Sequence, residues 1–223
     1  MILALESSTP WLSMGLFEEQ KVLFQVTHYT KMGHSQSIFQ YLEVLLREFH
    51  FHSHLEAVVV GLGPGFFTGV KIASIIGKGI AYAWEKPLYG FSTLEVLAKS
   101  VPEQEAVHYE FLVPVILHKK QELFWMTLPP NFSSFNVPYH IHVGSCEELF
   151  RTLSQRRILF VTPWKELKEY FTSQGFACAH PSHALPEARH LAGLYFLRRD
   201  SLSLEWEDLF RLVPFYGSKL FET

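Results

Sequence analysis

The chain contains only two aspartates among its 223 residues, Asp200 and Asp208, and both lie near its end. Enzymes that transfer phosphoryl groups depend on carboxylates that hold Mg²⁺ and orient the attacking oxygen. In the first hundred residues, Glu6 is the carboxylate best placed for that task, in the turn after an apolar run. A glutamate that caps a hairpin or points to water is an equally good interpretation. The shortage of aspartate therefore disfavours an independent phosphotransferase.

Cysteine pairs, long apolar runs and basic clusters are missing as well. Cys146 and Cys178 form neither a disulfide framework nor a CxxC metal motif. The first residues lack the basic segment of a signal peptide, and no stretch reaches the ~18 apolar residues of a membrane span. The net charge of −3 disfavours direct binding to nucleic acid through phosphate neutralisation. We therefore expect a cytoplasmic protein that makes no membrane contact and reaches RNA only through another subunit.

Apolar residues make up 48% of the chain and charged residues 18%, which is the balance of a globular protein with a substantial core. A length of 223 residues suits one large domain or two lobes of roughly 100 residues each. The polar stretch 101–110 marks a boundary, so we predict one lobe at 1–102 and a second at 103–223. Both lobes follow the order strand meander, helix, strand, helix.

Hydrophobic periodicity predicts the elements of each lobe. In the first lobe, strands are expected at 2–5, 11–17, 22–27, 57–61 and 88–91, and helices at 34–49, 67–84 and after Ser92 or Thr93. In the second lobe, strands are expected at 111–117, 122–126, 137–143, 158–161 and 176–179, and helices at 147–153, 164–171 and 185–199. Ser145 is expected to cap the helix that follows it.

The stretch 61–72, GLGPGFFTGVKI, joins a predicted strand to a predicted helix. Glycine permits close backbone approach, proline fixes one φ angle, and Thr68 is placed to cap the helix. Free N–H groups at a helix start can bind an anion, but these letters match neither the P-loop nor the G-x-G-x-x-G motif. Spacing alone favours a structural turn over a loop that cradles a ligand.

The helix after this turn carries small residues, namely Ala73, Gly77, Gly79, Ala81 and Ala83. Small side chains let another element approach closely, and an interior glycine costs roughly 1 kcal/mol relative to alanine. Close packing is therefore expected to compensate for the glycines. The packing partner is either a helix of another protein or the chain's own sheet.

Two histidine groups, at 50–54 and at 140–142, could present imidazoles to a metal ion. Neither group has an acidic or thiolate neighbour at ligand spacing, so no metal site is predicted. The hydroxyl side chains at 7–9 lack a G-x-S-x-G elbow and an orienting group, which makes a nucleophilic triad a poor interpretation. We therefore predict no catalytic residue and no cofactor.

Four segments, at 3–8, 34–35, 63–72 and 92–94, resemble the TsaB family, which is also called YeaZ. They follow the family patterns L-A-I-D-T-S, H-S, G-P-G-S-F-T-G-[LV]-R-I-G and S-T-L in order and spacing. The resemblance implies an α/β, actin-like or Hsp70-like (ASKHA) fold of two lobes, with mixed sheets and flanking helices. It also implies a non-catalytic scaffold that binds and activates a TsaD-like transferase, which makes N6-threonylcarbamoyladenosine at tRNA position 37.

The resemblance places the partner on helices of the first lobe, and it leaves open a homodimer through the same helices and a contact with the TsaE ATPase. The expected interface residues are His34, Ile38, Gly63, Pro64, Gly65, Phe66, Phe67, Thr68, Gly69, Lys71, Ile72, Ile75 and Gly77. A nucleotide at a joint site would meet Glu6, Ser7, Ser8, Lys119 and Lys120.

Three departures from the family pattern weaken nucleotide binding by this chain alone: Glu6 replaces Asp, Phe66 replaces Ser, and Lys71 replaces Arg. The alternative is an autonomous enzyme of the same fold, either an ATP-dependent small-molecule kinase or a metalloprotease. Glu6 and the histidine groups would supply its chemistry. A third interpretation is a structural module that self-associates through the same helices.

Overall fold

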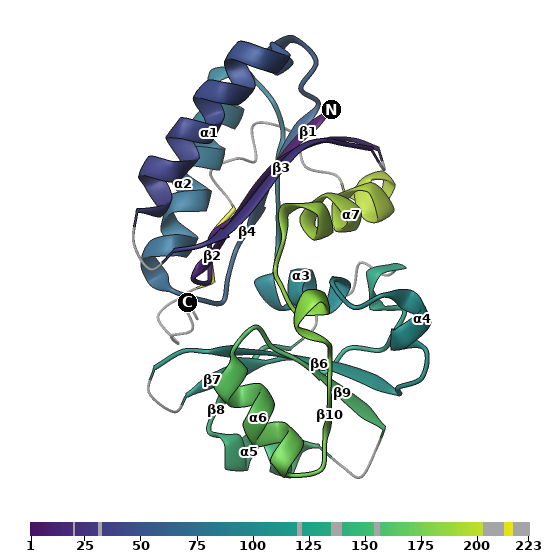
Figure 1. Ribbon diagram of the computed structural model, residues 1–223. Helices are drawn as coiled ribbons and strands as arrows, with labels where there is room; N and C mark the ends of the chain where they lie inside the picture. Colours follow the sequence, from purple (N-terminus) through teal and green to yellow (C-terminus); the bar gives the residue numbers. More distant parts are fainter. Residues whose placement is uncertain are drawn as a thin grey trace.

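The computed structural model describes residues 1–19, 21–30, 33–119, 122–134, 140–153, 157–202 and 212–215. Two five-stranded sheets lie one above the other, with helices on their outer faces and between them (Figure 1). The strand orders are β3-β2-β1-β4-β5 and β10-β9-β6-β7-β8. Both sheets mix parallel and antiparallel pairs. None of the helices in the described residues has the length and apolar character that crossing a membrane requires.

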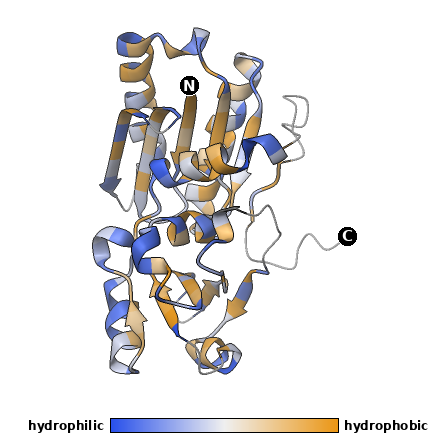
Figure 2. Ribbon diagram, turned by 90° about the vertical axis from the view of Figure 1, so that its right-hand side faces the viewer, coloured by the Kyte–Doolittle hydropathy of each residue, from blue (hydrophilic) through white to orange (hydrophobic). Residues whose placement is uncertain are grey.

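The first sheet consists of β1 (Ile2–Glu6), β2 (Trp11–Glu18), β3 (Lys21–Tyr29), β4 (Ala57–Gly61) and β5 (Leu88–Phe91). β1 pairs antiparallel with β2 and parallel with β4, so it lies at the centre of the sheet. β1 and β4 are buried along their whole length because helices cover both faces. Figure 2 shows the hydrophobic residues along these strands that such burial requires.

The helices α1 (His34–Phe49) and α2 (Phe67–Ala83) lie side by side on one face of the first sheet (Figure 1). α7 (Ala188–Arg198) packs on the other face. Successive residues of β1 point to opposite faces, so Leu3 joins the core under α1 and α2, whereas Ala4 joins the core under α7. The strands predicted in this lobe, and the helices at 34–49 and 67–84, are confirmed with small shifts at their ends.

The second sheet consists of β6 (Phe111–Leu117), β7 (Leu123–Trp125), β8 (His142–Gly144), β9 (Ile158–Val161) and β10 (Ala177–Cys178). The helices α5 (Cys146–Thr152) and α6 (Lys165–Ser173) cover its outer face (Figure 1). Ser145 caps α5 as predicted, in a capping box with Glu148. The strand expected at 137–143 begins only at His142, and residues 135–139 lie outside the described part of the chain.

The space between the sheets is filled by α3 (Thr93–Lys99) and α7, whose apolar side chains form one continuous core with both lobes. Ser92 caps α3 in a capping box with Glu95, as one of the two expected caps. The short α4 (Glu103–Ala106) follows where the lobe boundary is predicted. Four 3-10 turns complete the described elements: η1 (Phe51–Ser53), η2 (Phe132–Ser134), η3 (Pro181–His183) and η4 (Arg199–Ser201).

The chain returns to its first lobe near the end. α7 belongs to the second half of the sequence, yet it packs on the first sheet, where the Ala188 amide donates to Ser13 Oγ at 2.8 Å. Further on, the Phe215 amide donates to the Leu62 carbonyl at 2.8 Å. The division into lobes at 1–102 and 103–223 stays a prediction, because α7 ties the two halves together. The mixed sheets with flanking helices confirm the α/β fold class.

Candidate partner-binding surface

The glycine turn, residues 62–66, connects β4 to α2 and is bonded to the start of α3. The Leu62 amide donates to the Phe91 carbonyl at 2.9 Å, and the Gly63 carbonyl accepts from the Thr93 amide at 2.7 Å. Gly63 has a φ of +84°, a left-handed conformation that favours glycine. The turn is therefore fixed on its outer side by the β5–α3 junction.

The hairpin turn between β1 and β2 covers the inner side of the glycine turn. The Phe66 amide donates to the Ser8 carbonyl at 2.7 Å, and the Ser7 hydroxyl donates to the Gly69 carbonyl at 2.7 Å. A Cβ atom at Gly65 or Gly69 would overlap the carbonyl oxygen of Ser8 or Ser7. These glycines serve close backbone approach within the lobe, as the structural interpretation of the turn predicts.

α2 begins at Phe67, with Phe66 at the N-cap position and no side-chain capping bond. The prediction that Thr68 caps this helix is wrong, because the backbone already turns into the helix at Phe66, where the amide is bonded to Ser8. Thr68 lies inside the first turn of α2 and is exposed.

Glu6 is completely buried beside Gly61. Its Oε1 accepts from the Ser8 amide at 2.7 Å, and its Oε2 accepts from the Thr93 hydroxyl at 3.1 Å. A Cβ atom at Gly61 would overlap the Glu6 carboxyl group, so this glycine makes room for it. Burial raises the pKa of Glu6, and the hydrogen bonds from Ser8 and Thr93 oppose that rise. Glu6 thus ties the hairpin turn to α3.

Ser7 and Ser8, the other first-lobe residues of the predicted nucleotide contact, are also completely buried. Lys119 is exposed at the turn between β6 and β7, and Lys120 lies outside the described residues. A joint nucleotide site made by these residues stays a prediction. Glu6, Ser7 and Ser8 would have to leave their buried positions to touch a nucleotide.

The two histidine groups take part in ring packing. His52 lies tilted against Trp84, with 6.3 Å between ring centroids, and His142 stacks on Trp125 at 5.4 Å. Burial lowers the pKa of His142, and the charge of His140 adds to this effect. Within the described residues, no group of three His, Cys, Asp or Glu side chains could hold a metal ion.

The sides of α1 and α2 that face away from the sheet carry large apolar side chains. On α2, Ile75 is 67% exposed and Tyr82 is 60% exposed. On α1, Phe39 is 60% exposed. The Lys71 ammonium lies 4.0 Å from the centre of the exposed Phe67 ring, which is a cation–π contact. We call this surface the α1–α2 face, and it consists of Phe39, Leu46, Phe66, Phe67, Lys71, Ile75 and Tyr82.

The predicted interface stays a prediction, and the structure places part of it inside the first lobe. Seven of its residues are buried within the first lobe: His34, Ile38, Gly63, Pro64, Gly65, Gly69 and Gly77. A Cβ atom at Gly77 would lie 2.5 Å from Val60 Cγ1, so Gly77 faces β4 and lets α2 pack closely on its own sheet. Ala73 and Ala81 are buried in the same way, whereas Gly79 and Ala83 are exposed. The buried residues lie away from a partner that would dock on the outer side of the helices.

The other expected interface residues lie at or near the surface. Phe66, Phe67, Thr68, Lys71 and Ile75 are exposed, and Ile72 is half-buried. The sequence prediction did not include Phe39, Leu46 or Tyr82 in the interface. Phe39 and Leu46 stand off the stripe of buried positions on α1, which is the signal that could have identified them.

Comparisons with known proteins agree on one family. A family model described as TsaD, tRNA N6-adenosine threonylcarbamoyltransferase, matches residues 22–146. The tRNA threonylcarbamoyladenosine biosynthesis protein TsaB of Bacillus subtilis is 33% identical over 98 residues, and this match spans 44% of the chain and 43% of that protein. The protein of the same name from Buchnera aphidicola subsp. Schizaphis graminum is 25% identical over 173 residues, which is 75% of the chain and 81% of that protein.

A solved structure has the same fold over both lobes. YeaZ from Pseudomonas aeruginosa is 22% identical and superposes with a TM-score of 0.75, covering 96% of this chain and 98% of that chain. This likeness shows that the two chains share one fold, and the α/β class predicted from the sequence is confirmed. The family model spans more than half of the 223 residues, and its match agrees with the names of the relatives. The chain therefore belongs to the TsaB (YeaZ) family.

Proposed function

We propose that this chain is a non-catalytic subunit that binds and activates a TsaD-like transferase in the formation of N6-threonylcarbamoyladenosine in tRNA. Family membership supports the pathway, because the relatives are named tRNA threonylcarbamoyladenosine biosynthesis protein TsaB. The observation that carries the partner role is the α1–α2 face. Large apolar side chains grouped on one surface are typical of protein–protein contacts.

The glycine turn supports the non-catalytic part of the proposal. The Phe66 amide donates to the Ser8 carbonyl, and the Glu6 carboxyl group accepts hydrogen bonds from the Ser8 amide and the Thr93 hydroxyl. These groups are the ones that a first-lobe phosphate or magnesium site would need. The autonomous kinase or metalloprotease is therefore the weaker candidate, and the isolated protein is expected to turn over no ATP in a phosphate-release assay.

Two exposed apolar residues give a matched test of the α1–α2 face. Ile75, on α2, is 67% exposed, and Val107, just after α4, is 66% exposed. α4 lies on the far side of the molecule from α1 and α2 (Figure 1). Ile75→Asp should weaken binding to the TsaD-like partner by about 30-fold or more, the effect of truncating an interface hot spot. Val107→Asp should leave binding within about twofold.

Binding would be measured by titration calorimetry with the purified partner, and modification by the amount of threonylcarbamoyladenosine formed on tRNA. Both variants should melt within a few degrees of the wild type, because neither side chain is buried. Equal binding by the two variants would exclude the α1–α2 face as the contact. A TsaD-like transferase that is fully active without this chain would overturn the scaffold role.

The same purified proteins also test the homodimer and the contact with TsaE. Light scattering of the isolated chain measures whether it pairs with itself, and Ile75→Asp should abolish that pairing if it uses the α1–α2 face. Adding the TsaD-like partner to the wild-type chain should convert a homodimer into a heterodimer, because both contacts would use the α1–α2 face. Co-purification of the TsaE ATPase with the heterodimer, in comparison with each subunit alone, tests the third contact.

A further inference from the structure

A pocket of about 360 Å³ lies between the two lobes. The residues that line it are Trp11 at the start of β2 and Thr162, Pro163, Trp164, Lys165, Lys168, Pro181 and Leu185 from the second half of the chain. Its lining is mostly apolar, and none of its residues belongs to the α1–α2 face. Pockets of this size, with aromatic walls and few polar groups, are typical of small-molecule sites.

Both tryptophans of the pocket are held in place by their own lobes. Trp11 makes an edge contact with Tyr29, with 5.2 Å between ring centroids, and its amide donates to the Thr9 hydroxyl at 3.2 Å. Trp164 occupies the N-cap position of α6 and packs against the apolar cores on both sides of the second sheet. Each indole is only half-buried, so part of its surface remains available to a ligand in the pocket. A flat aromatic ring suits two such fixed surfaces.

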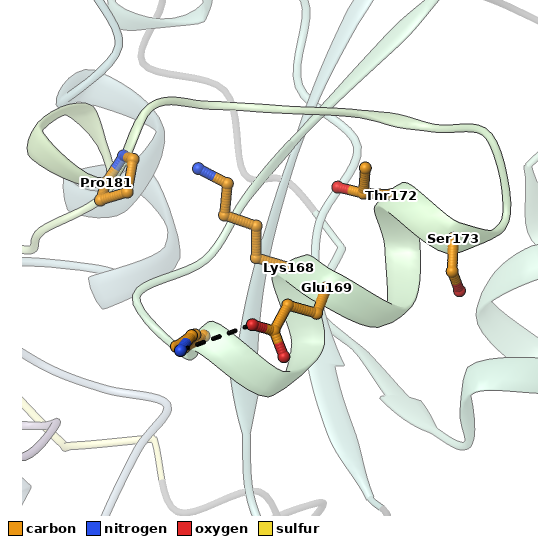
Figure 3. A pocket seen from close by; sticks show the side chains of 6 residues that line it. Lys168, Glu169, Thr172, Ser173 and Pro181 are labelled. Carbon is orange, nitrogen blue, oxygen red and sulfur yellow. Dashed lines mark ion pairs between the residues drawn. The ribbon is translucent and has the colours of Figure 1, made fainter.

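Lys168 supplies a positive charge at the edge of the pocket. Figure 3, which draws a neighbouring pocket that Lys168 also lines, shows its side chain extending from α6 toward Pro181. Its ammonium group donates to the Ala179 carbonyl at 3.0 Å, and no carboxylate among the described residues forms an ion pair with it. Lys165 also lines the pocket, but it is exposed and paired with Glu169 at 3.6 Å, as the dashed line in Figure 3 marks. A half-buried cation without a counter-charge favours an anionic ligand.

We propose that this inter-lobe pocket binds a small aromatic molecule that carries one anionic group. The ring lies against Trp11 and Trp164, and the anion lies at the Lys168 ammonium group. This site is separate from the α1–α2 face, so it stands whether or not the chain binds a TsaD-like partner.

Two probes separate the ring from the charge: 1-naphthoate, which is an anion, and 1-naphthalenemethanol, which has the same ring and no charge. Titration calorimetry with the full chain should show that naphthoate binds about tenfold more tightly, because of its charge-assisted bond to Lys168. Lys168→Met should lower the naphthoate affinity about tenfold and leave the alcohol unchanged. Lys71→Met is the control, and it should change neither affinity by more than about twofold, because Lys71 is exposed on the α1–α2 face, outside the pocket.

Two further variants test where the ring binds. Leu185→Trp places a large side chain in the pocket and should abolish binding of both probes. Trp11→Leu keeps the pocket apolar but removes one indole, so it should weaken both probes equally. Circular dichroism and thermal melting show that each variant is folded. The proposal is overturned if the wild type binds no naphthoate at millimolar concentration, if both lysine variants lose affinity equally, or if folded Leu185→Trp and Trp11→Leu bind as the wild type does.

Discussion

Replacing Arg198 by methionine would remove the buried cation that joins α7 to α3 and to the η2 turn. Arg198 Nη1 donates to Glu95 Oε1 at 2.8 Å, while its Nε and Nη2 donate to the carbonyls of Ser133 and Phe132 at 3.2 Å each. Arg198 is 5% exposed and the Glu95 side chain 12%, so both charges are largely removed from water. Methionine retains an apolar stem but donates no hydrogen bond.

The size of the effect follows from this burial. Removing one partner of a buried ion pair costs about 3–5 kcal/mol, because the remaining charge stays buried without its partner. We expect about 3 kcal/mol for Arg198→Met, at the lower end of that range, because the Ser92 amide still donates to Glu95 at 3.3 Å. The neighbouring Arg199→Met is a matched control. Its side chain is 42% exposed and lies 3.9 Å from Asp200, so its loss should change the free energy of unfolding little.

Urea denaturation followed by circular dichroism would measure the free energy of unfolding of both variants. Arg198→Met should shift the midpoint to lower urea with an unchanged slope. A double variant with Arg198→Met and Glu95→Gln should recover part of the loss, because no unpaired charge remains buried. If Arg198→Met were as stable as Arg199→Met, the ion pair would contribute nothing to the joining of the lobes.

Three further substitutions, at Gly69, Gly79 and His190, each test one residue. Gly69→Ala should lower the free energy of unfolding by about 1–3 kcal/mol, the usual cost of overpacking, because its Cβ atom would overlap the Ser7 carbonyl oxygen. The melting temperature should fall accordingly. Gly79→Ala, on the open side of the same helix with nothing within 4 Å, should instead stabilise the protein by up to about 1 kcal/mol. Burial lowers the pKa of His190 from 6.5 to about 3, so the folded protein keeps this ring neutral. In the unfolded chain the His190 ring binds a proton below pH 6.5, whereas in the folded protein it does so only near pH 3. Lowering the pH from 6.5 to 3 should therefore decrease the free energy of unfolding, by up to about 1.4 kcal/mol per pH unit from this group. His190→Gln should flatten that fall in urea titrations at several pH values.

Local signals in the sequence predicted most of the elements, because each depends on a few neighbouring residues. The apolar run of β1 and the one before the glycine turn fix two central strands. The serine at 92 and the serine at 145 each stand three residues before a glutamate, which is the pattern of a capping box. Such features are decided within one turn of backbone, so they can be read before the fold is known.

The side of α2 that faces the sheet could not be predicted in the same way. Apolar and small residues occur all around this helix, so its periodicity does not distinguish the side that faces the sheet from the side that faces solvent. Gly77 and Ile75 are two residues apart and lie on opposite sides, one against Val60 and the other exposed. Only the position of β4 decides between them, and that is a contact between distant parts of the chain.

The burial of Glu6 could not be predicted from the sequence for the same reason. The sequence places it in a polar turn, where a carboxylate normally meets water. In the structure the acceptor atoms of Glu6 are taken by Ser8 and by Thr93, and Thr93 is 87 residues away along the chain. The return of α7 to the first sheet is a further long-range contact, and no pattern within the helix announces it.

The hydrogen bonds that hold the glycine turn in place affect the entropic cost of binding a partner. Binding a partner costs about 0.5–1.5 kcal/mol for each flexible side chain that becomes immobile, and ordering a loop adds to this cost. Here the backbone at Gly63 and Phe66 is already held by Thr93 and Ser8, so the start of α2 has little freedom left to lose. Lys71 already rests on the Phe67 ring. The α1–α2 face is thus preorganised at this end.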